Sequence, residues 1–198
     1  ATVIATAPTM SRGMFVSMSQ QMVMTYGSSL NAWDALTQDS GVPGIGIYRD
    51  PLLIQWCDVS NFFEWTASAT TQAGNFRIPT GSEIVAGGAT KNRNIFWTDL
   101  DLYVQTYINV PLIYSTNKVG SNCGILGQHA WGQFGDATYW MGKRNFFVYA
   151  GQGVLVLPCT VWDAVFQDMH PDAGGTACCG SNTDFTEMWW FWRSRLNV

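Results

Sequence analysis

The residues best suited to chemistry in this sequence form a short segment rich in histidine, cysteine and aspartate. His170, Cys178 and Cys179 lie close together, and Asp168 and Asp172 flank the histidine. These are zinc-ligand types, but structural zinc sites pair cysteines at spacings such as C-x2-C and need a second, matching pair. Here one pair is adjacent and the other is absent, so buried or loop thiols are the simpler interpretation. No metal and no other cofactor is predicted.

A cysteine–histidine nucleophile is the second candidate chemistry. Cys159 could pair with His129 or His170, because an imidazole that takes up the thiol proton activates the sulfur. Cys159 lies in the phrase LPCT, which is typical of a strand end, and the sequence places no carboxylate to orient the histidine. A small buried apolar residue is therefore the favoured interpretation of Cys159. The five cysteines, an odd number without a signal peptide, are expected to be reduced and mostly buried.

Two pairs of acidic residues have the types needed to cleave a glycosidic bond. They are Asp99 with Asp101, and Asp58 with Glu64. Neighbouring acids of this kind also occur in solvated turns, which is the simpler interpretation. Asp58 and Asp99 follow a tryptophan at the same offset, and this recurrence predicts a structural role in which they bond backbone amides of a turn. A carboxylate-dependent hydrolase stays open as an alternative.

A tryptophan-centred strand phrase recurs along the chain and would position any such groups. It reads IQWCD, IFWTD, TYWMG and WWFWR, at steps of 41, 43 and 50 residues between Trp56, Trp97, Trp140 and Trp190. A second aromatic strand is expected after three of these anchors, at residues 62–65, 102–104 and 146–149. A period of about 40–50 residues is that of a β-propeller blade. The sequence therefore predicts an all-β fold of antiparallel, propeller-type blades.

The chain is expected to divide into two regions. Residues 1–47 are expected to hold one strand within 19–28 and a long loop that contacts a neighbour, and residues 48–198 to form the propeller-like repeat. A hairpin is predicted at 149–157 and one short helix at 163–169. The last anchor leaves too little sequence for a whole blade. The propeller is therefore expected to be incomplete, so that a neighbouring chain or further sequence completes it.

The composition is poor in charge. Charged residues make up 12% of the sequence, whereas about 25% is usual. Much of such a surface is expected to lie against other protein. The net charge is −4 and the cations form no basic footprint, so sequence-specific binding of nucleic acid is not predicted. No apolar run reaches the ~18–20 residues of a membrane span.

Several phrases around the tryptophan anchors resemble one protein family. They are WxDxxNxxxW, YWMGxxxFxxY, LPCTVxDxVF and ExWWF, and the similarity extends over most of residues 45–195. As a set they resemble phage tail proteins of the packaged-DNA-stabilisation family, the hub or nozzle proteins of short-tailed, podovirus-type phages. Each phrase is weak alone, and the set is more specific than any member.

The resemblance implies a virion structural protein without enzymatic activity, placed in the tail and assembled in the host cytoplasm. Proteins of this family form β-propeller-bearing rings around the DNA exit channel and help to retain and release the packaged genome. The expected partners are copies of this chain in a ring, for which a hexamer is expected, and other tail and portal-adaptor proteins. Double-stranded DNA would pass through the ring without sequence-specific binding.

A channel that passes DNA is expected to have a mildly acidic wall, which does not trap the polyanion. The acids that could supply such a wall are Asp34, Asp39, Asp99, Asp101 and Asp136. Strand alternation puts Trp190 and Trp192 on one face and Trp189 on the other, which predicts blade core plus one interface residue. An alternative from another class is a carbohydrate-binding propeller or lectin at the tail tip, with Trp192 as a sugar-stacking residue.

Overall fold

The computed structural model describes residues 4, 6–8, 10–19, 21–28, 49–109 and 112–196. Within these ranges the chain is almost entirely β, as predicted. Fourteen strands form four antiparallel sheets, and helix is limited to α2 (Trp162–Asp168) and a 3-10 turn at Ala173–Gly175. The position of α2 agrees within one residue with the helix predicted at 163–169. No helix in the described ranges is long and apolar enough to cross a membrane.

The first two sheets are four-stranded meanders in which each strand pairs with the next one along the chain. Blade 1 contains β1 (Gly13–Val16), β2 (Val23–Tyr26), β3 (Leu53–Trp56) and β4 (Gly74–Arg77). Blade 2 contains β5 (Ile84–Ala89), β6 (Asn94–Thr98), β7 (Leu102–Asn109) and β8 (Ile113–Gly120). Because β2 pairs with β3, blade 1 extends across the boundary predicted at residue 48.

The third sheet repeats this meander, and the fourth has two strands. Blade 3 contains β9 (Trp131–Phe134), β10 (Ala137–Met141), β11 (Phe146–Tyr149) and β12 (Val154–Leu157). Blade 4 contains β13 (Cys178–Asn182) and β14 (Glu187–Phe191). The pairing of β11 with β12 confirms the hairpin predicted at 149–157. Within the described ranges the sheets form no closed barrel, and an incomplete, propeller-like all-β fold is confirmed.

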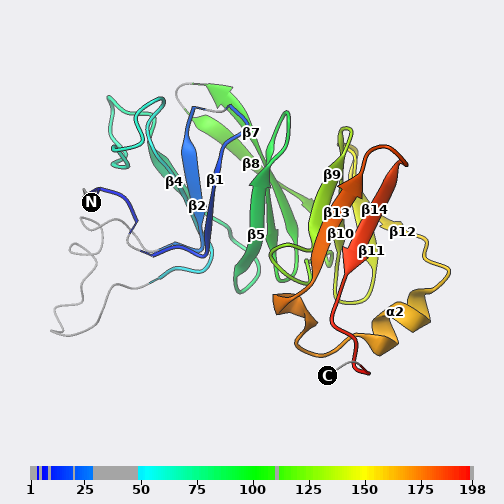
Figure 1. The fold of residues 1–198 in the computed structure, drawn as a ribbon. Coiled ribbons are helices and arrows are strands. Elements are labelled where there is room, and N and C mark those ends of the chain that lie inside the picture. Colours follow the sequence, from blue (N-terminus) through cyan, green and yellow to red (C-terminus); the bar gives the residue numbers. More distant parts are fainter. Residues whose placement is uncertain are drawn as a thin grey trace, which may run out of the picture.

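The blades follow one another in chain order, from blade 1 at the left of Figure 1 to blades 3 and 4 at the right. Their first strands are neighbours, because β1 contacts β5 and β9 contacts β13. The backbone N–H of Cys179 donates to the carbonyl of His129 at 2.9 Å and joins the start of blade 4 to blade 3. Radial repetition of four-stranded sheets with adjacent first strands is the arrangement of a propeller.

Strand β6 of blade 2 is buried on both faces. All five residues of β6 are buried. The ring of Phe96 packs on that of Phe15 in blade 1, with the ring centroids 5.6 Å apart, and the ring of Trp97 packs on that of Trp131 in blade 3, with the centroids 5.0 Å apart. A strand covered on both sides has a continuous apolar sequence rather than an alternating one. One hydrophobic core fills the space between blades 1 and 2, and a second core, termed here the C-terminal core, lies between blades 2, 3 and 4.

The tryptophan anchors do not occupy equivalent positions, which corrects the predicted repeat. Trp56 lies in β3, the third strand of its blade, whereas the other three anchors lie in the second strands β6, β10 and β14. The aromatic strand predicted at 62–65 is instead a turn with Phe62 and Phe63 exposed. The other two predicted aromatic strands are parts of β7 and β11. Blade 1 carries no tryptophan in its second strand, and its first two strands precede the repeat.

Candidate functional site

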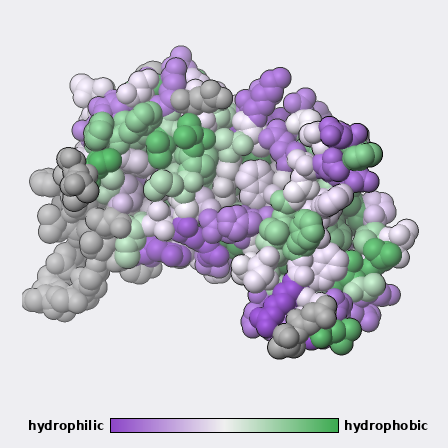
Figure 2. Space-filling model, viewed as in Figure 1, coloured by the Kyte–Doolittle hydropathy of each residue, from purple (hydrophilic) through white to green (hydrophobic). Residues whose placement is uncertain are grey.

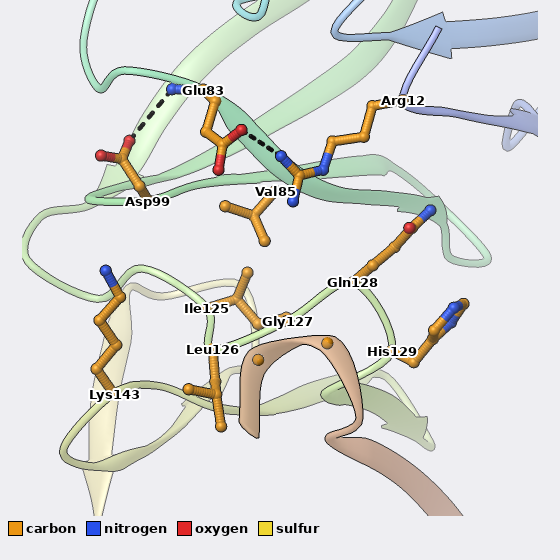
Figure 3. Close-up of a pocket in the computed structure, with 12 residues that line it drawn as sticks. Arg12, Glu83, Val85, Asp99, Ile125, Leu126, Gly127, Gln128, His129 and Lys143 are labelled. Carbon is orange, nitrogen blue, oxygen red and sulfur yellow. Dashed lines mark hydrogen bonds and ion pairs between the residues drawn. The ribbon is translucent and has the colours of Figure 1, made fainter. Parts of the chain in front are cut away.

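One pocket, termed here the axial pocket, is lined by residues that lie in or next to each of the four blades (Figure 3). Its lining includes residues close to the first strand of each blade: Arg12 precedes β1, Glu83 precedes β5, Gln128 precedes β9 and Gly174 precedes β13. The cavity volume is about 380 Å³. The axial pocket is therefore the place where segments from every blade come together.

The acidic groups of the axial pocket make structural contacts. Glu83 forms an ion pair with Arg12, and Figure 3 shows the two side chains directed at each other. Asp99 accepts the backbone N–H of Ser82 at 2.8 Å and the hydroxyl of Ser82 at 2.7 Å. Burial favours the neutral form of Asp99, but hydrogen bonds from Ser82 and the Glu83 amide outweigh this effect and lower its pKa. Asp99 is therefore ionised at neutral pH and fixes the segment that leads into β5.

Two basic side chains, His129 and Lys143, are exposed at the rim of the axial pocket. Gln128 donates from Nε2 to the Tyr26 hydroxyl at 3.0 Å and links blade 3 to blade 1. The pocket thus combines exposed basic side chains with acidic side chains that already form an ion pair or hydrogen bonds within the chain. In the part of the chain that the structure describes, no group of three or more His, Cys, Asp or Glu side chains could hold a metal ion.

One wall of the axial pocket is a close backbone contact between blades 3 and 4. A Cβ atom at Gly127 would overlap the carbonyl oxygen of Gly174, and a Cβ atom at Gly174 would lie 2.6 Å from the carbonyl oxygen of Leu126. Glycine permits such an approach because it has no side chain. The two glycines therefore join the segment before β9 to the segment before β13.

Asp101 contributes nothing to an exposed acidic surface, which corrects the prediction that it could line a channel. Its side chain is 1% exposed and pairs with Lys118 Nζ at 2.7 Å. It also accepts the Thr80 hydroxyl at 2.5 Å and the backbone N–H of Asn122 at 3.3 Å. Burial opposes ionisation, but the hydrogen bonds from Lys118 and Thr80 outweigh it and lower the pKa of Asp101. Asp101 is a buried link between the segment before β7 and strand β8.

The remaining acids expected at a channel differ in their placement. Asp136 is exposed in the turn between β9 and β10. Asp34 and Asp39 lie outside the described residues. Asp58, like Asp99, accepts a backbone amide, but its donor is Gln72 N at 2.7 Å, in the segment that leads to β4 rather than in the adjoining turn. Of the acids predicted to face DNA, Asp136 is thus the one that the described structure places fully at the surface.

The carboxylate pairs have a different environment from those of a glycosidase. The general acid of a glycosidase needs a raised pKa, whereas the pKa values of Asp99 and Asp101 are both lowered. In the second pair, Glu64 Oε1 accepts the backbone N–H of Thr66 at 2.7 Å and shapes a local turn. These contacts favour structural roles for the acids.

The thiols have the environments of structural residues. The five cysteines are free, and Cys178 is exposed, although the sequence predicts that most are buried. Burial raises the pKa of Cys123 to about 11 and that of Cys179 to about 11. Both thiols are therefore protonated at neutral pH, which makes them weak nucleophiles. Cys159 is partly buried and packs against the C-terminal core.

The tryptophan anchors of blades 2 and 3 meet at the contact between these blades. Trp97 and Trp140 are fully buried, and their rings lie edge to face at 5.7 Å. The indole N–H of Trp140 donates to the carbonyl of Cys123 at 2.8 Å, in the segment that connects the two blades. Trp97 thus faces the following blade and Trp140 faces the preceding one.

The other predicted tryptophans also lie at blade contacts. Trp56 contacts Tyr114 of blade 2 edge to face at 5.2 Å. Trp190 and Trp192 both pack against the C-terminal core, whereas Trp189 is exposed, as strand alternation predicts. Because Trp192 is partly buried, its ring is only partly available for stacking on a sugar.

Sequence reasoning predicted that Trp189 faces away from the core, but it missed the other residues that are exposed at the two ends of the blade series. Met14 and Val16 of β1 are 68% and 53% exposed, and Trp189 and Phe191 of β14 are 51% and 55% exposed. Figure 2 shows hydrophobic side chains gathered over blade 1 at the left and over the C-terminal blades at the right. The predicted repeat begins at Trp56, so it includes neither strand β1 nor Arg12 of the axial pocket. The run of three apolar residues in GMFV is the signal that could have found this strand.

Comparison with known protein families and with curated protein sequences gives no match for this chain.

Proposed function

We propose that this chain is a structural subunit of a phage tail. In this role it forms part of the hub or nozzle ring around the DNA exit channel and helps to retain and release the packaged genome. The observation that carries the proposal is the open series of blades, with three four-stranded sheets, a two-stranded fourth, and exposed apolar side chains in the strands β1 and β14. Exposed apolar patches of this kind mark sites of interaction with other protein.

Two of the four phrases that resemble tail proteins lie at the contacts between blades. YWMGxxxFxxY contributes Trp140 and Phe146, and ExWWF contributes Trp190. Trp140 meets Trp97 at 5.7 Å and Phe146 meets Trp190 at 4.8 Å. The resemblance thus concerns residues that build the blade series, which supports a shared architecture. The low charged fraction of 12% also supports a surface that lies against other protein.

The mechanism is mechanical and electrostatic. Blades that pack in series make a stiff wall, because each contacts only its neighbours and adds to one continuous core. A ring of subunits repeats one heterologous interface until it closes. With a net charge of −4, the subunit repels DNA, so the genome can slide past it.

Phage particles assembled without this chain are expected to package DNA and then lose it, because the exit channel lacks part of its closure. The measurement is the DNA content per particle after density-gradient purification. Adding the purified chain to freshly packaged particles should restore DNA retention, and a heat-unfolded sample of the chain serves as the control. Particles that lack the chain and stay filled with DNA would refute the proposed function.

A further inference from the structure

The fourth strand of blade 3 has an entirely apolar sequence, although one of its edges is open (Figure 1). This strand, β12, pairs with β11 alone, and in the described ranges no backbone hydrogen bond reaches its other edge. Leu155 and Val156 are 69% and 57% exposed. Because successive side chains of a strand point to opposite sides, apolar surface is open on both sides of this edge. We term Val154–Leu157 the β12 edge.

The fourth strands of blades 1 and 2 carry charged residues. Strand β4 contains Arg77, which pairs with Asp50 at 2.7 Å. Strand β8 contains Lys118, and it pairs with β7 through two register shifts. Charges and irregular pairing keep an open strand edge from pairing with other chains. The β12 edge has neither, since it carries no charge and pairs with β11 without a shift. It therefore has the features of an edge that another strand covers.

The backbone of the β12 edge restricts what can cover it. Every second residue of an edge strand directs its N–H and C=O groups outward. An added strand bonds both kinds of group, whereas a helix uses its backbone groups internally and a lipid chain offers none. With Leu155 exposed on one side and Val156 on the other, the added strand needs apolar residues on both of its sides.

Basic side chains lie at both ends of the β12 edge. At the start of the strand, Arg93 lies over the ring of Tyr149, 5.2 Å from its centroid, and Tyr149 pairs with Val154. After the end of the strand, the indole N–H of Trp162 donates to the carbonyl of Arg144. Neither arginine forms an ion pair with a residue that the structure describes. Acidic residues at both ends of an added strand would therefore complement the charge of this edge.

The same charges make a second copy of β12 a poor partner. In antiparallel pairing, Arg93 of one copy would approach Arg144 of the other, and in parallel pairing each arginine would approach its own counterpart. Like charges opposite each other on paired strands are destabilising. Asp163, the first acidic residue after β12, does not offset them, because it accepts Gln167 Nε2 at 3.4 Å and forms no ion pair with a described residue.

We propose that the β12 edge binds an extended segment of another protein, which adds to blade 3 as a fifth strand. The segment has apolar residues at its centre, on both sides of the strand, and acidic residues at both ends. Main-chain hydrogen bonds to β12 supply affinity, and the apolar and acidic side chains supply specificity. This interface goes beyond the proposed function and holds or fails independently of it.

Three peptides test the added strand, with isothermal titration calorimetry on the full chain as the measurement. The first, DDVIVIDD, is blocked at both termini and is expected to bind. The second, KKVIVIKK, keeps the apolar centre and reverses the flanking charges, so it is expected to bind at least about tenfold more weakly. The third keeps the sequence DDVIVIDD but has N-methyl groups on its four central amides. It is expected not to bind, because the donors of the added strand are gone.

Hydrogen exchange and two variants locate the site. The first peptide is expected to slow exchange within β12 and to leave β4 and β8 unchanged. The double variant Leu155→Ser and Val156→Ser is expected to weaken binding at least about tenfold, because both apolar contacts are lost. Leu112→Ser is the matched control, since Leu112 is also 69% exposed but lies before β8, and it should bind like the wild type. Circular dichroism checks that both variants are folded.

Several outcomes would overturn the added strand. They are a first peptide that does not bind, an N-methylated peptide that binds as well as the unmodified one, and slower exchange outside β12 alone. Equal binding of the acidic and basic peptides would overturn the charge complementarity. Unchanged binding by the folded double serine variant would place the site away from the β12 edge.

Discussion

Replacing Trp140 with alanine is expected to lower the free energy of unfolding by about 3–5 kcal/mol. Trp140 is fully buried, stacks on Phe147 at 5.5 Å and meets Trp97 at 5.7 Å. Its removal opens a cavity between blades 2 and 3 and deprives the Cys123 carbonyl of the indole N–H donor, which adds the cost of a buried polar group without its partner. Domains have a total stability of only about 5–15 kcal/mol, so this loss is a large share of it.

Urea unfolding, followed by far-ultraviolet circular dichroism, measures this loss. Phe63→Ala is the control, because this exposed aromatic residue is expected to change the free energy of unfolding by less than about 0.5 kcal/mol. The dependence of the free energy of unfolding on urea concentration should be similar in the wild type and both variants, since the surface exposed on unfolding is similar. Equal losses for Trp140→Ala and Phe63→Ala would mean that the contact between blades 2 and 3 is absent.

Replacing Gly127 with alanine is expected to lower the free energy of unfolding by about 1–3 kcal/mol or more, which is the typical penalty for forcing extra volume into a packed site. The new methyl group would overlap the carbonyl oxygen of Gly174, and a backbone carbonyl cannot turn away as a flexible side chain can. The segment before β13 must therefore move. The hydrogen bond from Cys179 N to His129 O, 2.9 Å long, joins the same two blades and should weaken with it.

Hydrogen exchange, resolved by peptide, locates the effect of Gly127→Ala. Amides of β13 and β14 are expected to exchange faster than in the wild type, whereas those of blade 1 should be unchanged. Gly175→Ala is a matched control from the same wall of the axial pocket, because no atom lies within 4 Å of the position of its Cβ. Faster exchange in blade 1, or an equal effect of Gly175→Ala, would contradict the proposed junction.

Local patterns predicted the class of the fold. Two of the three predicted aromatic strands, the hairpin at 149–157 and the helix at 163–169 depend on neighbours in the sequence, and the structure confirms them. The third aromatic strand, at 62–65, is a turn. The sides of Trp189 and Trp190 also followed from strand alternation alone. The position of each anchor within its blade did not follow from the local sequence. Trp56 has the same local phrase as the other anchors, but it lies in the third strand of its blade.

The candidate sites depend on contacts that the sequence cannot display. Arg12 pairs with Glu83 across 71 positions, and the axial pocket exists only because segments from four blades converge. Asp101 has the sequence context of an exposed turn acid, yet Lys118 and Thr80 enclose it in the folded chain. Burial of this kind is set by tertiary packing, so acids that look alike in the sequence have different roles.

The most direct test of the proposed role is a cryo-EM reconstruction of the tail of the DNA-filled particle. The expected result is a ring of this chain around the DNA channel. A reconstruction that places the chain away from the DNA path, or in no part of the tail, would contradict it.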